Sequence, residues 1–113
     1  MPISALNKRP YRFYRYDTTD GALGIAGVED SGGAPSYGWE TISIHMVLTQ
    51  AGTLVVYQRL RASSTWAITN TFAYLAAGVL DTVIPVTAEM VKIIFTNGGV
   101  AQAPEILCGL AAA

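Results

Sequence analysis

The side chains that most often carry out chemistry in proteins are few in this sequence and far apart. Among its 113 residues there is one histidine, His45, and one cysteine, Cys108. A zinc site needs at least three protein ligands at characteristic spacings. No serine or threonine lies in a recognisable nucleophile turn. We therefore predict no catalytic residue, no metal site and no cofactor, and we expect that the chain is not an enzyme.

Acidic residues cluster near glycines between positions 17 and 30, but their order does not match a calcium-binding loop. Asp17 and Asp20 precede Gly21, and Glu29-Asp30 precede Gly32. A calcium loop needs acidic or amide residues at alternate positions followed by glycine. The two adjacent acids would point to opposite faces of a strand, so they are poorly placed to act together on a glycoside. We interpret this segment as turns.

The most distinctive local pattern interleaves basic and aromatic residues from Asn7 to Tyr16. Tyrosine and arginine lead the residues that dominate protein interfaces, so we predict that this segment is an arm that binds a partner protein. Basic and aromatic residues also bind single-stranded nucleic acid, and a solvated first strand would look similar. The acidic balance of the remaining chain disfavours nucleic acid. The predicted partner-binding residues are Arg9, Tyr11, Arg12, Phe13, Tyr14, Arg15 and Tyr16.

The composition of the whole chain indicates extensive contact with other proteins. Hydrophobic residues make up 51% of the sequence, which is ordinary, but only 13% are charged, against about 25% in typical soluble domains. A small domain with few charges exposes much neutral surface, and such surface usually contacts a partner. No apolar leader begins the chain, and residues 62–80, which carry no charge, contain many polar side chains. We expect a protein made in the cytoplasm that does not span a membrane.

From Trp39 onward the sequence alternates between short apolar runs and turn residues, which predicts an all-β fold. In 41–48, Ile42, Ile44, Met46 and Leu48 share one face, and His45 lies on the other. Five further strands are predicted, with Pro85 indicating an edge position and Asn97-Gly98-Gly99 indicating a hairpin. They cover residues 54–60, 65–72, 79–86, 89–96 and 105–110.

These strands must position any functional residue. We predict an antiparallel β-sandwich, jelly-roll-like, over residues 39–113, preceded over residues 1–38 by an extended basic and aromatic arm with loops.

A sandwich has sheet edges that invite pairing, so we expect the chain to form an oligomer, a homotrimer in the first instance. The candidate interface residues are Trp39, Tyr57 and Leu110. For Leu110, as for Ile106 and Cys108, a place in the core is the simpler interpretation.

Several runs of residues, in this order, resemble a small β-sandwich module of tailed-bacteriophage structural proteins. From the first run to the last they span about half of the chain, and the run that ends in Thr96-Asn97-Gly98-Gly99 is the most recognisable. They are residues 54–58, 63–66, 71–72, 76–78, 83–86, 91–99 and 101–102.

The resemblance implies a virion component and, for a chain of this length, a capsid decoration (cement) protein. Such a protein would bind the major capsid protein on the capsid surface as an oligomer and stabilise the shell. Residues 1–38 have no counterpart in the resemblance.

Two alternatives stay open. Similar modules occur in tails and fibres, so the chain could connect such parts. Trp39 and Trp66 could instead stack on sugars in a carbohydrate-binding module, which uses the same architecture.

Overall fold

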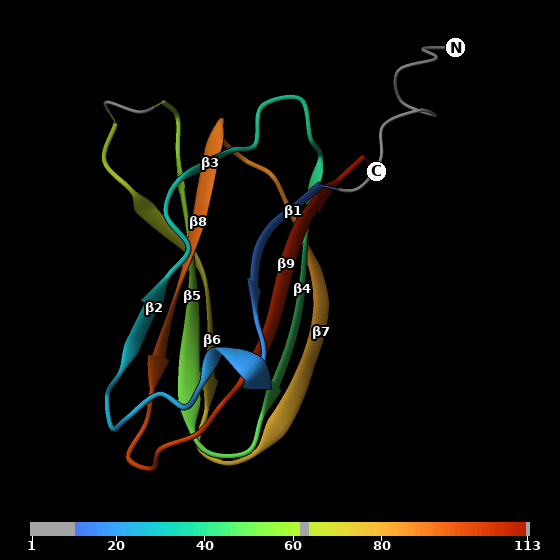
Figure 1. The fold of residues 1–113 in the computed structure, drawn as a ribbon. Coiled ribbons are helices and arrows are strands. Elements are labelled where there is room, and N and C mark those ends of the chain that lie inside the picture. Colours follow the sequence, from blue (N-terminus) through green and yellow to red (C-terminus); the bar gives the residue numbers. More distant parts are fainter. Residues whose placement is uncertain (1–10, 62–63, 113) are drawn as a thin grey trace.

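The computed structural model describes residues 11–61 and 64–112, which fold as two antiparallel β-sheets packed face to face (Figure 1). The prediction of an all-β antiparallel sandwich is confirmed. A single 3-10 turn, Thr18–Asp20, follows the first strand. The strands are β1 (Tyr11–Tyr16), β2 (Val28–Asp30), β3 (Ala34–Pro35), β4 (Thr41–Leu48), β5 (Gly52–Arg59), β6 (Ala67–Tyr74), β7 (Gly78–Pro85), β8 (Met90–Asn97) and β9 (Glu105–Ala111).

The two sheets have four main strands each. Sheet 1 has the order β1-β9-β4-β7, and sheet 2 has the order β2-β8-β5-β6, with the short β3 also pairing with β8. The predicted edge position of Pro85 is confirmed, because β7 is the last strand of sheet 1. The connections β4 to β5, β6 to β7 and β8 to β9 each cross from one sheet to the other. The sheets are thus joined repeatedly along the chain.

The core fills the space between the sheets with the apolar faces of the strands. The predicted inward set of β4, from Ile42 to Leu48, is buried, and so are Val91, Ile93 and Phe95 of β8. Burying one such side chain stabilises the fold by about 1.5–3 kcal/mol. His45 points the other way, as predicted, and lies on the outer face of sheet 1.

The predicted hairpin at Asn97-Gly98-Gly99 is wrong, because β8 and β9 belong to different sheets. Asn97 is buried, and its side-chain nitrogen lies 3.0, 2.8 and 3.0 Å from the carbonyl oxygens of Leu23, Gly24 and Val100. These bonds satisfy the backbone of a chain that leaves one sheet for the other. A side chain that supports a crossing looks, in sequence, like the first residue of a hairpin turn.

Gln102 forms hydrogen bonds at the end of the sandwich where Asn97 lies. Its side-chain oxygen accepts hydrogen bonds from the amides of Thr49 and Gln50 at 3.0 and 3.1 Å. Its side-chain nitrogen donates to the carbonyls of Gln50 and Ala51 at 3.2 and 2.9 Å and to the side-chain oxygen of Asn97 at 2.8 Å. One buried amide therefore ties the crossing between β8 and β9 to the crossing between β4 and β5.

Gln58 also joins the two sheets by hydrogen bonds, at the opposite end of β5. It is buried, its oxygen accepts from the amide of Thr87 at 2.8 Å, and its nitrogen donates to the carbonyl of Pro85 at 3.3 Å and to the hydroxyl of Thr69 at 3.2 Å. It links sheet 2 to the end of β7 in sheet 1.

The structure differs from the prediction of an N-terminal arm over residues 1–38. β1 pairs with β9 from Tyr11 opposite Leu110 to Tyr16 opposite Ile106, and β2 and β3 pair with β8. The described part of the range 1–38 therefore belongs to the sandwich, and residues 1–10 lie outside the described residues. Phe13 has no partner in the register of β1, so the strand contains a bulge. The bulge interrupts the period of two that identifies a strand in sequence.

Candidate functional site

The outer face of sheet 1 brings together side chains that do not pack into the core between the sheets. The register aligns residues across all four strands into rows that point away from the core. One row runs Arg12, Gly109, Ser43, Val83; the next runs Arg15, Leu107, His45, Asp81; and a shorter one runs Glu105, Val47, Val79. We call these three rows the outer face of sheet 1.

Among the hollows on this face, two adjoin each other at His45 and Leu107. The larger, of about 500 Å³, is lined by Ser43, His45, Asp81, Val83 and Leu107, among others. The smaller, of about 240 Å³, shares His45 and Leu107 and extends across to β1. Both are shallow depressions over a sheet, and both combine apolar and charged side chains. Such a surface suits contact with another protein better than enclosure of a small molecule.

His45 and Asp81 form the closest polar pair on this face. The ring nitrogen Nδ1 of His45 lies 2.5 Å from Oδ1 of Asp81, across the pairing of β4 with β7. Ser43 lies on the same face of β4, two residues away, which raises the question of a Ser-His-Asp site.

A serine nucleophile must be hydrogen-bonded to its histidine base. The hydroxyl of Ser43 instead faces the carbonyl oxygen of Gly109 at 3.5 Å, and among the described residues no hydrogen bond joins it to His45. The constellation therefore lacks the contact that would activate Ser43.

The outer face of sheet 2 is different, because its charged and aromatic side chains contact each other. The guanidinium of Arg59 lies 4.1 Å from the ring centre of Trp66, and the ammonium of Lys92 lies 5.0 Å from it. Lys92 also lies 5.3 Å from the ring of Tyr57 and 3.7 Å from a carboxylate oxygen of Asp30. Cation–π contacts of this kind are worth about 0.5–1 kcal/mol at exposed sites. These groups are engaged within the chain.

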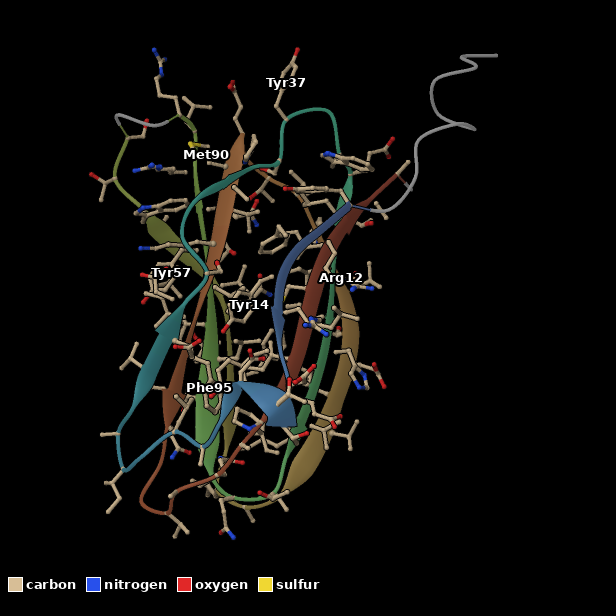
Figure 2. All side chains as sticks on the ribbon, viewed as in Figure 1. Arg12, Tyr14, Tyr37, Tyr57, Met90 and Phe95 are labelled. Carbon is tan, nitrogen blue, oxygen red and sulfur yellow. The ribbon has the colours of Figure 1, made fainter. Side chains whose placement is uncertain are left out.

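Of the predicted arm residues, the structure gives Tyr14 and Tyr16 a structural role. Tyr16 is buried, and its hydroxyl donates to the carbonyl of Gly21 at 2.5 Å. Tyr14 lies between the sheets in Figure 2 and donates to a carboxylate oxygen of Glu29 at 3.0 Å. Burial, helped by Glu29, raises the pKa of Tyr14 well above its usual range. Phe13 packs against the core. These three side chains hold β1 in place.

Tyr11, Arg12 and Arg15 remain on the surface. Tyr11 is half exposed, and Arg12 and Arg15 point to the outer face of sheet 1. Arg15 forms an exposed ion pair with Asp17 at 3.0 Å. That carboxylate also caps the 3-10 turn, and the hydrogen bonds from Thr19 lower the pKa of Asp17. Arg9 lies outside the described residues.

The three candidate interface residues lie apart from one another. Leu110 is fully buried in the core, so its prediction as an interface residue is wrong. Trp39 is half-buried against the core just before β4. Tyr57 lies on the outer side of sheet 2, as Figure 2 shows. Trp66 belongs to that same face, so the structure does not bring Trp39 and Trp66 together as one platform for sugars.

Leu107, Asp81 and Val83 belong to the site but were not predicted from the sequence. The signal for them was present, because each occupies an outward position in a predicted strand. Their closeness to Arg15 and His45 follows only from the pairing of strands that are distant in sequence.

Within residues 11–61 and 64–112, no group of three or more histidine, cysteine, aspartate or glutamate side chains could hold a metal ion. No helix in that part of the chain is long and apolar enough to cross a membrane.

Comparison with known proteins gives a likeness of fold. No protein-family model and no curated protein sequence matches the chain. A solved structure, described as the PBSX exported protein XepA, is similar over 100% of this chain with a TM-score of 0.74 and 15% sequence identity. The chain covers 40% of that protein. At this identity the similarity shows that the two share the sandwich architecture.

Proposed function

We propose that this chain is a structural protein of a bacteriophage particle that binds the outer surface of the capsid as an oligomer and stabilises the shell. The observation that carries the proposal is the outer face of sheet 1. It is a broad, shallow surface of mixed apolar and charged side chains, and few of them are engaged in holding the fold together.

A further feature supports a phage role, because the order of short sequence runs resembles tailed-phage structural modules. The sandwich fold is shared with a protein described as the PBSX exported protein XepA. Both agree with a chain that acts through the surface it covers.

In this proposal the chain performs no chemistry. The hydrogen bond between His45 and Asp81 fixes the direction of the imidazole, and the free side of the ring then points to whatever covers the face. Leu107, at the centre of the face between the two hollows, is the apolar contact, and the charged side chains around it set the orientation. An interface with an apolar centre and a polar rim excludes water from its centre.

The test is co-sedimentation of the purified chain with expanded capsids of the phage that encodes it, followed by electron microscopy of the particles. We expect the chain on the capsid surface at regular positions. Leu107→Arg should abolish binding, because it places a charge at the centre of the interface. Thr96→Arg, the matched control, adds the same side chain to the outer face of sheet 2 and should leave binding intact.

Three results would contradict the proposal. The native chain could fail to sediment with capsids. Microscopy could place it on the tail or fibre. Leu107→Arg could bind as well as the native chain while remaining folded by circular dichroism.

A further inference from the structure

The edges of the two sheets are protected very unequally. An edge strand exposes unpaired backbone groups, and proteins guard such edges with short strands, bulges or charges. On one side of the sandwich, β2 and β3 have three and two residues, and β1 has a bulge and the outward side chains of Arg12 and Arg15. This side carries all three protections, and the arginines of β1 favour only a partner edge that carries the opposite charge.

The opposite side carries fewer, namely a bulge at Thr69 in β6 and Pro85 at the end of β7. β7 pairs with β4 at eight consecutive positions without a bulge, so its outer edge is long and regular. Its outward side chains Val79 and Val83 are 60% and 63% exposed. Asp81 is the single charged residue from position 67 to position 85, which includes β6 and the turn with the 96% exposed Leu75. A long apolar edge of this kind is a template for another strand.

The direction of the strands selects a partner edge. Each pairing in sheet 1 is antiparallel, so β1 and β7, at the two ends of four strands, run in opposite directions. A second copy rotated about an axis parallel to the strands therefore presents its β1 antiparallel to β7 of the first. Neither copy has to be inverted.

The charges select the same partner edge. Arg15 and Asp81 are the two ends of one row, and Arg12 ends the neighbouring row. If sheet 1 continues into a second copy, the arginines of β1 come beside Asp81 of β7, within the spacing at which cross-strand side chains interact. Pairing β7 with β7 about a two-fold axis would instead place two Asp81 carboxylates together near the strand centre, which is unfavourable.

Arg15 and Asp81, at the two ends of the row, each keep part of their bonding capacity free among the described residues. Asp81 contacts His45 through Oδ1, and its side chain is 70% exposed. Arg15 contacts Asp17 through Nη1, and within the described residues Arg12 has no ion-pair partner. Both sides can therefore form a further charge pair.

We propose that copies of this chain join edge to edge, with β7 of one copy pairing antiparallel with β1 of the next, so that sheet 1 continues from copy to copy. The contact is head-to-tail, and it closes into a ring where the rotation allows. This inference deepens the oligomeric part of the proposed function by naming the surfaces that meet.

The test measures self-association of the full chain alone, without capsids, by sedimentation velocity over a wide range of concentrations. We expect a concentration-dependent oligomer. Asp81→Arg and the double variant Arg12→Glu, Arg15→Glu should each raise the dissociation constant by roughly 100-fold, since like charges then face each other across the junction. Glu89→Arg, an exposed control with the same change of charge, should assemble as the native chain does.

The decisive step combines the two defective variants. In an equimolar mixture, the arginine introduced on β7 of the first variant faces the two glutamates introduced on β1 of the second. In the opposite order, Asp81 of the second variant faces the native arginines of the first. Each junction between the two different variants is therefore complementary in charge. The mixture should associate at least into dimers of one variant with the other, which a ring of odd size does not prevent, although each variant alone does not associate. The triple variant that carries all three changes should assemble on its own.

Circular dichroism and thermal unfolding establish that every variant is folded, and Asp81→Asn, which removes only the charge, provides a milder second test with a smaller weakening. A monomeric native chain would overturn the inference. So would variants that assemble normally, or a mixture that stays dissociated while the proteins are folded. None of these results touches capsid binding through Leu107, so failure here and failure of the proposed function are distinguishable.

Discussion

Polar side chains between the two sheets and polar side chains on the outer face of sheet 1 have opposite surroundings. Between the sheets, Gln102, Asn97 and Gln58 bond to backbone groups at sheet crossings. On the outer face, Arg12, His45 and Asp81 have one close partner or none among the described residues. The first set holds the fold together, and the second is available to a partner. A polar side chain in this sandwich is therefore structural when it forms hydrogen bonds with the backbone where the chain crosses between sheets.

Removing the side chain of Gln102 should have the largest effect on the stability of the fold. Gln102→Ala leaves the amides of Thr49 and Gln50 and the carbonyl of Gln50 without their partner in a part-buried place, while the carbonyl of Ala51 keeps its bond from the amide of Gly98. Each unsatisfied buried group costs about 1–3 kcal/mol, partly recovered by relaxation and water. We expect the free energy of unfolding to fall by about 4 kcal/mol, measured by urea denaturation. Gln50→Ala, the same change at an exposed side chain, should alter it by less than about 0.5 kcal/mol.

Gln58→Ala should have the next largest effect. It removes the acceptor for the amide of Thr87 and the donor to the carbonyl of Pro85. We expect a loss of about 2 kcal/mol in urea denaturation, since fewer backbone groups are left unpaired than around Gln102. A loss as small as that of Gln50→Ala would mean that Gln58 does not fasten the two sheets.

The reactivity of the Cys108 thiol reports whether the core around β9 is closed to reagents. Burial raises the pKa of the Cys108 thiol to about 12, whereas the unfolded thiol ionises near its ordinary value, so the unfolded state loses its proton first. Stability linked to Cys108 is therefore complete below about pH 8.5 and declines as pH rises towards 12. At pH 8, iodoacetamide should modify the thiol in urea and leave it intact in the native chain, by mass spectrometry. Rapid native labelling would show that β9 opens locally.

The smallest effect is expected on the outer face. His45→Ala and Asp81→Asn should each change the free energy of unfolding by less than about 0.5 kcal/mol, because exposed pairs contribute little. Denaturation at neutral pH checks this. A loss comparable to that of Gln58→Ala would mean that the pair is structural and would remove the contrast between the two regions.

Much of the fold follows from alternation in the sequence. The predicted strand 41–48 coincides with β4, and the other five lie within two residues of β5 to β9 at either end, because each alternates apolar and polar residues above a common core. The assignment of strands to sheets did not follow, since a turn of given length can close a hairpin or cross between sheets. Asn97 shows this most clearly.

The candidate site was less predictable for a related reason. In β1, Phe13 occupies a bulge, so Tyr14 and Tyr16 no longer alternate with Arg12 in the expected way, and a strand looks like an arm. The outer face joins Arg15, Leu107 and Asp81, which are far apart in the chain. The alternation within a single sequence predicts the face of the strand on which each side chain lies. It does not predict which residue lies beside that side chain on the neighbouring strand.

The pairing of Tyr11 with Leu110 has a practical consequence. Facing residues of neighbouring antiparallel strands lie about 5 Å apart, so the start of β1 and the end of β9 meet at one pole of the molecule. A short peptide could link them, and new ends could then be opened at the exposed turn around Ala76. Cargo attached directly before Tyr11 or directly after Ala111 would project from that same pole, leaving both flat faces and the long flank of β7 uncovered.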